Sequence, residues 1–392
     1  MEELVLGWQS QPNTLGTLDI IHSCITTILL CRWSCVCPNV PRPDITTSGS
    51  AMLQIRWQLF TILFPEVTVA IAGEQWESSN QGWSHRRAFF ADMGGILLKA
   101  PEFPAFPVDC QQLAYLVENR YVKMPSISER DITDRNKADG PTRLLAVCQI
   151  IWFTIQCIGR EVQGLGLSTL ELTTLTFILC TLNMYFFWAF KPRDVQSPIM
   201  VLTDNTLDAI LLNAGDKARQ PYSRTPLDFI KPPQHDKMSL NSPFWLGVNS
   251  IVHVDEDPGR RPIRYIGNDK TMPPMGIDLP KRLYGIMLEI IYSGLHFFGV
   301  LLEFPSLAER YLWVASSSAL AIVVILYLLA VYMGHSAISP LPRWASLALH
   351  GSVILVYAMA RMYILVEGFV GLRVLPAKLY ICVEWLNFLP HP

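Results

Sequence analysis

The chain alternates between long apolar runs and polar connections. Seven runs each approach the ~20 residues that an α-helix needs to cross the hydrocarbon core of a bilayer. They cover residues 18–37, 52–73, 143–163, 168–190, 284–304, 311–333 and 346–370. The pattern predicts an all-α polytopic membrane protein, a bundle of about seven transmembrane helices within one membrane domain that spans residues 1–392.

A shorter apolar stretch, residues 88–100, raises the possible number of helices to eight. Its sequence, AFFADMGGILLKA, follows the basic triplet of His85, Arg86 and Arg87. Thirteen residues are too few to span a bilayer as a helix. We therefore expect this stretch to re-enter the membrane or to lie in its interface.

Two long polar connections interrupt the spans, at residues 74–142 and 191–283. The second is rich in proline, which disfavours long helices, so we expect an irregular cap loop there. Both connections carry more Lys and Arg than the short ones, which favours a cytosolic location for them. The first 18 residues contain no Lys or Arg, so we expect the first apolar run to remain as an uncleaved anchor.

The composition supports the membrane interpretation. Hydrophobic residues make up 51% of the chain and charged residues only 16%, against roughly 25% charged residues in soluble domains. The 31 basic and 33 acidic residues leave a net charge of −2. Because there is no basic excess to neutralise a phosphate backbone, nucleic acid is not an expected partner. The expected partner is the lipid bilayer.

Common catalytic motifs are absent from the sequence. It contains no GxxxxGK[ST] phosphate loop, no HExxH zinc motif, no GxSxG elbow and no CxxCH haem motif. Aspartate-rich motifs that bind magnesium and a prenyl diphosphate are absent too. We therefore expect neither a cofactor nor a metal ion.

Acids within or beside the apolar runs are the main candidates for chemistry. Ionisable groups at membrane depth are costly and tend to face a protein interior. Burial favours the protonated carboxyl, which can then donate a proton to an alkene or an epoxide. The candidates, in order, are Asp92 and Glu74, then Glu171 and Glu289. For each acid, an interfacial position or an ion pair with arginine is the alternative.

Aromatic residues near these acids are candidates for binding a substrate. Aromatic faces attract a cation by ~0.5 to 2 kcal/mol, so rings can line a pocket for a carbocation. The candidates are Trp83, Phe89, Tyr185 and Trp188, together with His296 near Glu289. The alternative for the group at Tyr185 and Trp188 is an interfacial aromatic belt.

Four segments carry a resemblance to a known family. They are His85 with residues 88–95, residues 134–139, Tyr185 and Trp188 with Lys191-Pro192, and Trp385 with Pro390-His391. Over residues 85–391 the chain resembles fungal integral membrane proteins that include terpene cyclases of meroterpenoid biosynthesis, of the drimane-forming macrophorin type. It departs from the family pattern at Ala189, since members usually carry paired tryptophans before Lys-Pro.

The resemblance implies a metal-independent, class II-type cyclisation. A protonated acid would activate the terminal alkene or epoxide of a farnesyl chain on an aromatic or quinol head, giving a drimane-like meroterpenoid. The implied partner is a lipophilic prenylated small molecule, and the implied location is the endoplasmic reticulum membrane. Two alternatives stay open: a membrane transporter or scaffold with buried acids, and an intramembrane acyl or prenyl transferase.

Overall fold

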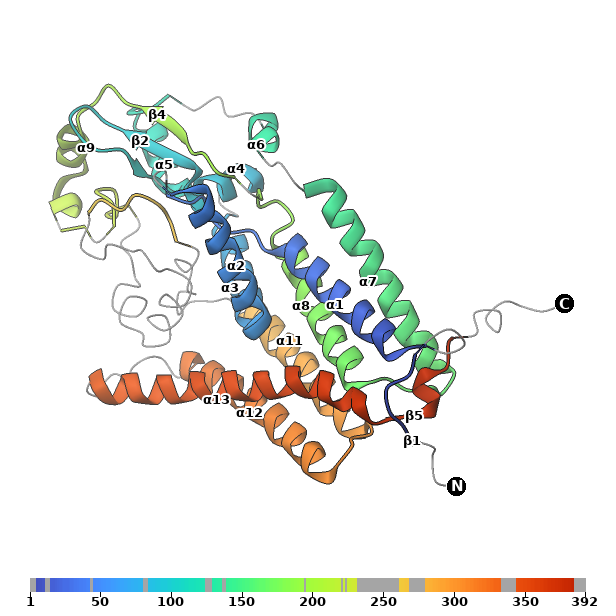
Figure 1. Ribbon diagram of the computed structural model, residues 1–392. Coiled ribbons are helices and arrows are strands. Elements are labelled where there is room, and N and C mark those ends of the chain that lie inside the picture. The colour runs from blue at the N-terminus through green and yellow to red at the C-terminus, as the bar shows by residue number, and fades with distance from the viewer. Residues whose placement is uncertain are drawn as a thin grey trace. The chain divides into compact units, whose positions relative to one another are not determined.

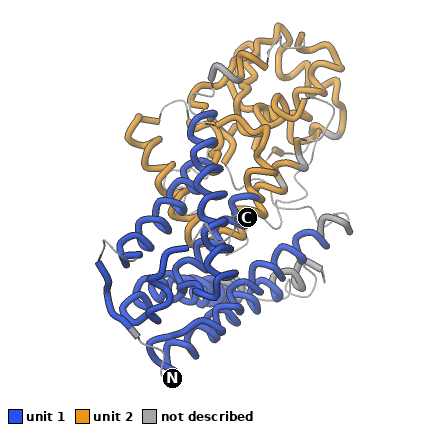
Figure 2. The backbone as a smooth tube through the Cα atoms, turned by 90° about the vertical axis from the view of Figure 1, so that its right-hand side faces the viewer, with its two compact units in different colours: residues 1–34, 140–182, 277–392 blue, residues 35–139, 183–276 orange. Residues whose placement is uncertain are grey.

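The computed structural model describes most of the chain. The described residues are 5–10, 15–42, 45–79, 84–123, 129–135, 139–193, 195–219, 221–222, 224–230, 261–267, 279–332 and 343–383. They form two compact units, each built from separate stretches of chain (Figure 2). Unit 1 comprises residues 1–34, 140–182 and 277–392, and unit 2 comprises residues 35–139 and 183–276.

Unit 1 consists almost entirely of long helices (Figure 1). They are α1 (Thr17–Cys35), α7 (Asp139–Val162), most of α8 (Thr169–Phe187), α11 (Leu279–Phe298), α12 (Leu307–Tyr332) and α13 (Arg343–Val370). Helices α11, α12 and α13 pack in sequence order, α11 against α12 and α12 against α13. A short antiparallel pair joins β1 (Val5–Leu6) to β5 (Leu375–Pro376), and 3₁₀ turns cover Gly299–Leu301, Gly371–Arg373 and Ala377–Tyr380.

Six of the described helices are long and apolar enough to cross a membrane, which indicates an integral membrane protein. Each contains or overlaps one of the runs predicted from the sequence. The remaining predicted span, residues 52–73, is broken into α2 (Thr47–Leu63) and α3 (Pro65–Ser78), bent by 109° at the break. Counting this bent pair as one span gives seven.

The break in the second span has a local cause. The pyrrolidine ring of Pro65 disfavours the α conformation of the residue before it. Phe64 accordingly adopts φ −132° and ψ 58°, outside the helical region. Pro65 then starts the new helix, where its missing N–H costs no hydrogen bond.

Unit 2 combines short helices with a small sheet that the sequence pattern did not predict. The sheet has the order β3 (Phe106–Pro107), β2 (Ile96–Lys99), β4 (Ile199–Leu202); β2 pairs antiparallel with β3 and parallel with β4. Besides α2 and α3, the helices are α4 (His85–Phe90), α5 (Cys110–Glu118), α6 (Glu129–Arg135) and α9 (Leu207–Ala214), with a π turn η1 at Ala91–Gly95 and a 3₁₀ turn at Gly215–Arg219.

The stretch at residues 88–100 is therefore not an eighth helix. It contains the end of α4, the π turn and strand β2, which together form a helix-to-strand transition. Strand β2 lies between two partners and is largely buried, as its apolar sequence ILLK requires. In the second connection, the described helices are short, as its prolines predict.

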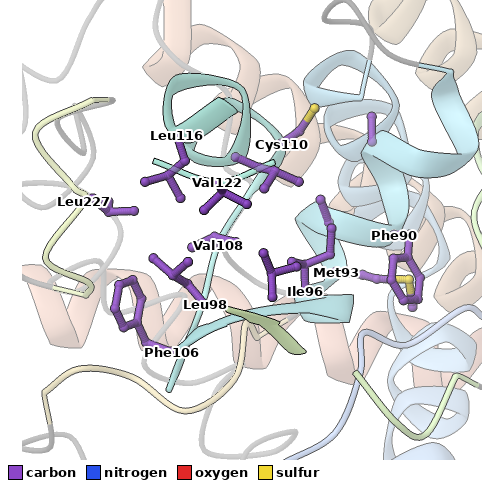
Figure 3. Packing of buried hydrophobic residues seen from close by; sticks show 14 of the residues in the cluster. Phe90, Met93, Ile96, Leu98, Phe106, Val108, Cys110, Leu116, Val122 and Leu227 are labelled. Carbon is purple, nitrogen blue, oxygen red and sulfur yellow. The ribbon is translucent and has the colours of Figure 1, made fainter. Parts of the chain in front are cut away.

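A hydrophobic core holds unit 2 together (Figure 3). It includes Phe90, Met93, Ile96, Leu98, Phe106, Val108, Cys110, Leu116, Val122 and Leu227. Most of these residues come from the connection at residues 74–142, which the sequence pattern had suggested to be polar. The core fixes the π turn between α4 and β2, and this turn carries Asp92.

Candidate functional site

Asp92 lies on the π turn that joins α4 to β2. Gly94 has φ 84°, a conformation that side chains disfavour, and a Cβ on Gly95 would overlap the carbonyl oxygen of Phe90. The double glycine of the sequence is thus required by this tight turn. Single π turns occur often at functional sites. Here the turn presents a carboxylate at the point where helix gives way to strand.

The Asp92 side chain is half-buried and held at the start of α5. Its Oδ1 accepts the backbone N–H of Cys110, the first residue of that helix, at 2.9 Å. Asp109 caps the same helix through the N–H of Gln112 at 2.8 Å. Helix N-termini favour negative charge, so this position orients the carboxylate.

Lys191 lies just beyond the end of α8 and is buried, with 2% of its surface exposed. Its Nζ donates to Gln75 Oε1 at 2.7 Å and to Asn39 Oδ1 at 2.8 Å. The indole N–H of Trp188 donates to the same Gln75 oxygen at 3.0 Å, and Lys191 Nζ lies 5.0 Å from the Trp188 ring centroid. Pro192, which follows directly, prevents further helix.

The two amides that receive the Lys191 amine are themselves fixed. Asn39 Nδ2 donates to the carbonyl oxygens of Ile266 and Gly267, at 3.3 and 3.1 Å, so its Oδ1 must face the amine. Gln75, on α3, uses one oxygen for both the amine and the indole. Two separated stretches of the chain, at Asn39 and Gln75, therefore supply acceptors to one nitrogen atom, and a third, at Ile266 and Gly267, orients one of them.

Burial is the main influence on the pKa of Lys191. Desolvation by burial lowers the pKa of Lys191 from 10.5 to about 7, while the negative charges of Cys37 and Asp92 act in the opposite direction. At neutral pH the amine is consequently a mixture of charged and neutral forms. The structure thus brings together two segments that carried the family resemblance, about one hundred residues apart in the sequence.

An aromatic cluster lies in the same unit, formed by Trp76, His85, Phe186, Phe187 and Phe190. Trp76 stacks on His85 with ring centroids 6.2 Å apart, and His85 stacks on Phe190 at 5.6 Å. Trp76 also contacts the rings of Phe186 and Phe187, each at 6.1 Å. Phe186 and Phe190 are exposed, so the cluster has an accessible aromatic surface.

The other predicted residues of unit 2 differ in their surroundings. Phe89 is 1% exposed on α4, Tyr185 is half-buried on α8, and Trp188 is buried against Gln75 and Lys191. Glu74 lies on α3, but its side chain is outside the described part of the structure. Trp83 lies outside the described residues altogether, as does the resembling segment at Trp385.

Glu171, the third predicted acid, belongs to unit 1 and contacts Ser168 and Arg160. Its Oε2 accepts both the backbone N–H and the hydroxyl of Ser168 at 2.8 Å, which caps the start of α8. Its Oε1 lies 3.7 Å from Arg160 Nε. Arg160 in turn donates to the carbonyl oxygen of Leu379 at 2.6 Å, so this buried ion pair joins the helices to the C-terminal turn.

Glu289 and His296 lie on α11, also in unit 1. Glu289 is 9% exposed and accepts the hydroxyl of Ser293 at 2.7 Å. His296 is buried, with Nδ1 3.1 Å from the Tyr292 carbonyl oxygen and Nε2 3.2 Å from Arg361 Nη1. These contacts fix both ring nitrogens of His296 within the helix packing.

Sequence reasoning missed three members of the site around Lys191. Lys191 itself was noted only within the resembling Lys-Pro pair, although a lysine directly after an apolar run is a usable signal. Asn39 and Gln75 carry no local signal, because only the fold brings their amides to the amine. Across the residues that the structure describes, no three His, Cys, Asp or Glu side chains form a group that would hold a metal ion.

Fold and site together define a helical integral membrane protein with a small sheet-containing unit that holds a buried amine, Lys191, and a carboxylate on a π turn, Asp92. The chain belongs to a family of unknown function, DUF8562, which it matches over residues 2–79, 74–214 and 285–392. No curated protein and no solved structure matches it. The matched segments include both Asp92 and Lys191.

Proposed function

We propose that this protein is a membrane-bound class II-type terpene cyclase. It protonates the terminal alkene or epoxide of a farnesylated aromatic or quinol compound and closes the chain to a drimane-like meroterpenoid. Asp92 is the acid. The observation that carries this proposal is the position of Asp92, half-buried on a tight turn in the same unit as a partly exposed aromatic cluster.

The position of Asp92 suits proton donation. One carboxylate oxygen is held by the N–H of Cys110, so the side chain is oriented, and partial exposure lets it meet a substrate. The backbone of the turn is fixed by the hydrophobic core on one side and by β2 on the other. An oriented acid on a rigid turn costs little reorganisation during the reaction.

The aromatic cluster suits the carbocation that follows protonation. The rings of Trp76, Phe186, Phe187 and Phe190 offer π faces, each of which attracts a cation by ~0.5 to 2 kcal/mol. Exposed Phe186 lies in the last turn of the apolar α8 and exposed Phe190 lies just beyond it, and a farnesyl chain partitions into the same environment. A membrane-bound enzyme also keeps water from the cation, which water would trap as an alcohol. We place the protein in the endoplasmic reticulum membrane.

The test is a direct conversion assay. Membranes containing the protein are incubated with a farnesylated phenol or quinol, and separately with its terminal epoxide, without added metal or nucleotide. The expected product is an isomer of equal mass with new rings, identified by mass spectrometry and NMR. Asp92→Asn should lower the rate by about 100-fold or more, as loss of a general acid does.

Control variants separate chemistry from folding. Asp228→Asn changes another buried aspartate of unit 2, whose carboxylate accepts the N–H groups of Arg224 and Thr225, and should retain conversion. Equal losses in both variants would point to folding rather than to an acid. A product heavier by one group would instead indicate a transferase, and no conversion across several head groups would favour a transporter or scaffold.

A further inference from the structure

One ring of the aromatic cluster, the imidazole of His85, has no part in the reaction as described so far. His85 is half-buried at the start of α4. Its ring stacks on that of Trp76 at an interplanar angle of 6° and on that of Phe190 at 19°. Among the five rings of the cluster, only the imidazole has a nitrogen that can accept a proton. The cluster therefore combines π faces with one base.

The hydrogen bonds of Ser79 fix the tautomer of His85. Ser79 is fully buried, and its hydroxyl donates to the carbonyl oxygen of Trp76 at 2.7 Å. The same hydroxyl oxygen lies 3.4 Å from Nδ1 of His85. A hydroxyl has only one hydrogen, so Nδ1 must be the donor in this second contact. The neutral imidazole thus carries its hydrogen on Nδ1 and its lone pair on Nε2.

The lone pair on Nε2 is available to a substrate. Among the residues that the structure describes, none forms a hydrogen bond with this nitrogen. The lone pair lies in the plane of the imidazole, so stacking on the ring faces leaves it accessible. Histidine is the side chain that most often serves as a general base in enzymes. The geometry of His85 is that of a base held in a defined orientation.

His85 and Asp92 lie on the same face of one helical element. Helix α4 continues directly into the π turn, and residues seven apart in a helix share a face. At 1.5 Å per residue they are about 10 Å apart along the axis. Phe89, which is 1% exposed, lies between them on this face, whereas Ala88 and Phe90 belong to the hydrophobic core. An acid and a base thus lie at the two ends of one short face.

We propose that His85 is the base that ends the cyclisation, with Nε2 removing the last proton from the carbocation. The role of His85 rests on the proposed cyclase function, whereas its tautomer rests only on the contacts of Ser79. Class II-type cyclisation adds a proton at one end of the new ring system and removes one at the other. Asp92 serves the first end, and His85, within the cluster assigned to the cation, serves the second.

The proton transfers balance over one cycle. The O–H bond of Asp92 breaks as a C–H bond forms on the terminal carbon of the prenyl chain. The π electrons of the chain then form the ring C–C bonds and leave a cation in the last ring. A neighbouring C–H bond breaks, its electron pair forms a C=C bond, and its proton forms the Nε2–H bond of His85. The imidazolium releases a proton to water, the carboxylate regains one from water, and the net change is an isomerisation.

The tautomer is tested by ¹⁵N NMR of the full-length protein in lipid nanodiscs. Histidine labelled with ¹⁵N in the ring separates protonated from unprotonated nitrogens, and the His85 signals are assigned by their loss in His85→Phe or His85→Gln. Neutral His85 should carry its hydrogen on Nδ1. Ser79→Ala should abolish this preference. Ser84→Ala is the matched control, because the Ser84 side chain precedes α4 without capping it and should leave the tautomer unchanged.

The conversion assay tests the role of the base. His85→Phe keeps an aromatic ring for stacking but lacks the lone pair, so Asp92 should still start the reaction. The equal-mass alkene should form about 100-fold more slowly, as expected for loss of a general base. Water should instead trap the cation, giving an alcohol heavier by one water. Ser79→Ala, which retains the imidazole, should increase the alcohol in the same direction, and Ser84→Ala should give the wild-type product.

The outcomes separate the base from the cyclase. A hydrogen on Nε2 in the wild type, or a tautomer that Ser79→Ala leaves unchanged, overturns the proposal even if His85→Phe fails to fold. A folded His85→Phe protein that forms the same alkene at the wild-type rate refutes the role of His85 and leaves the cyclase intact. Wild-type membranes that convert no prenylated substrate reject the cyclase and the base together.

Discussion

Raising the pH from 7 to 9 should stabilise the folded protein through Lys191. Burial lowers the pKa of Lys191 from 10.5 to about 7 on folding. Between these two values the unfolded chain binds more protons than the folded one, so the free energy of unfolding rises with pH. Each pKa unit corresponds to about 1.36 kcal/mol. Because the folded amine is half-charged at pH 7, the gain up to pH 9 is about 2 kcal/mol.

The assay compares the wild type with Lys191→Met. Equilibrium unfolding in detergent at pH 7 and pH 9, followed by tryptophan fluorescence, gives the pH dependence of each. Other groups titrate in this range, so the difference between the two proteins isolates Lys191. Lys99→Met is the control, since the amine of half-buried Lys99 donates to the Phe103 carbonyl in the same unit.

The Lys191→Met protein will have a lower stability, because the oxygen of Asn39 loses its amine donor. Gln75 keeps the indole of Trp188 as a donor. The prediction concerns the rise in the free energy of unfolding between pH 7 and pH 9. Lys191→Met should lack the contribution of about 2 kcal/mol from Lys191, and Lys99→Met should retain it. If the wild type and Lys191→Met gain equally between pH 7 and pH 9, the reasoning about the buried amine is wrong.

Two further predictions concern stability. Gly95→Ala forces a Cβ onto the Phe90 carbonyl oxygen and should lower the free energy of unfolding by about 1 to 3 kcal/mol. Gly140→Ala is the control and should have little effect, because a Cβ there meets no atom within 4 Å. Thermal unfolding of both variants checks this prediction. Glu171→Leu leaves Arg160 buried without its carboxylate and should cost about 3 to 5 kcal/mol in detergent unfolding. Stability equal to that of the wild type would show that this ion pair does not hold unit 1 together.

The membrane helices were predictable because their signal is local. An apolar run of about 20 residues has few alternatives to a spanning helix, and all six candidate spans coincide with predicted ones. The break at Pro65 was also readable from the sequence, since proline restricts the residue before it. The seven-helix pattern nevertheless passed over it, because both halves are apolar.

Strand β2 was not predictable in the same way. The segment ILLK is too short for its periodicity to distinguish strand from helix. Its conformation is decided by β3 and by β4, which lies about one hundred residues later in the chain. Non-local pairing of this kind leaves no trace in the local pattern.

The residues around Lys191 and Asp92 likewise divide into those with a local sequence signal and those positioned only by non-local packing. Asp92 became a candidate because an acid within an apolar stretch is unusual, and Gly94-Gly95 marked the turn that carries it. Lys191 was visible as a residue but not as a buried amine. Its burial depends on Asn39 and Gln75, whose positions follow only from the packing of unit 2.

The pairing of β1 with β5 has a consequence for how the protein is made. Val5 and Leu6 reach their partners only after residue 376 has been synthesised, on the order of 20 to 70 s later at ribosomal rates. Tyr380 donates to the Gly7 carbonyl oxygen and depends on the same late segment. Helix α1 is thus synthesised well before the segment that precedes it can pair with β5. A chain that is truncated before residue 375 lacks both the β1–β5 pairing and the hydrogen bond from Tyr380 to Gly7.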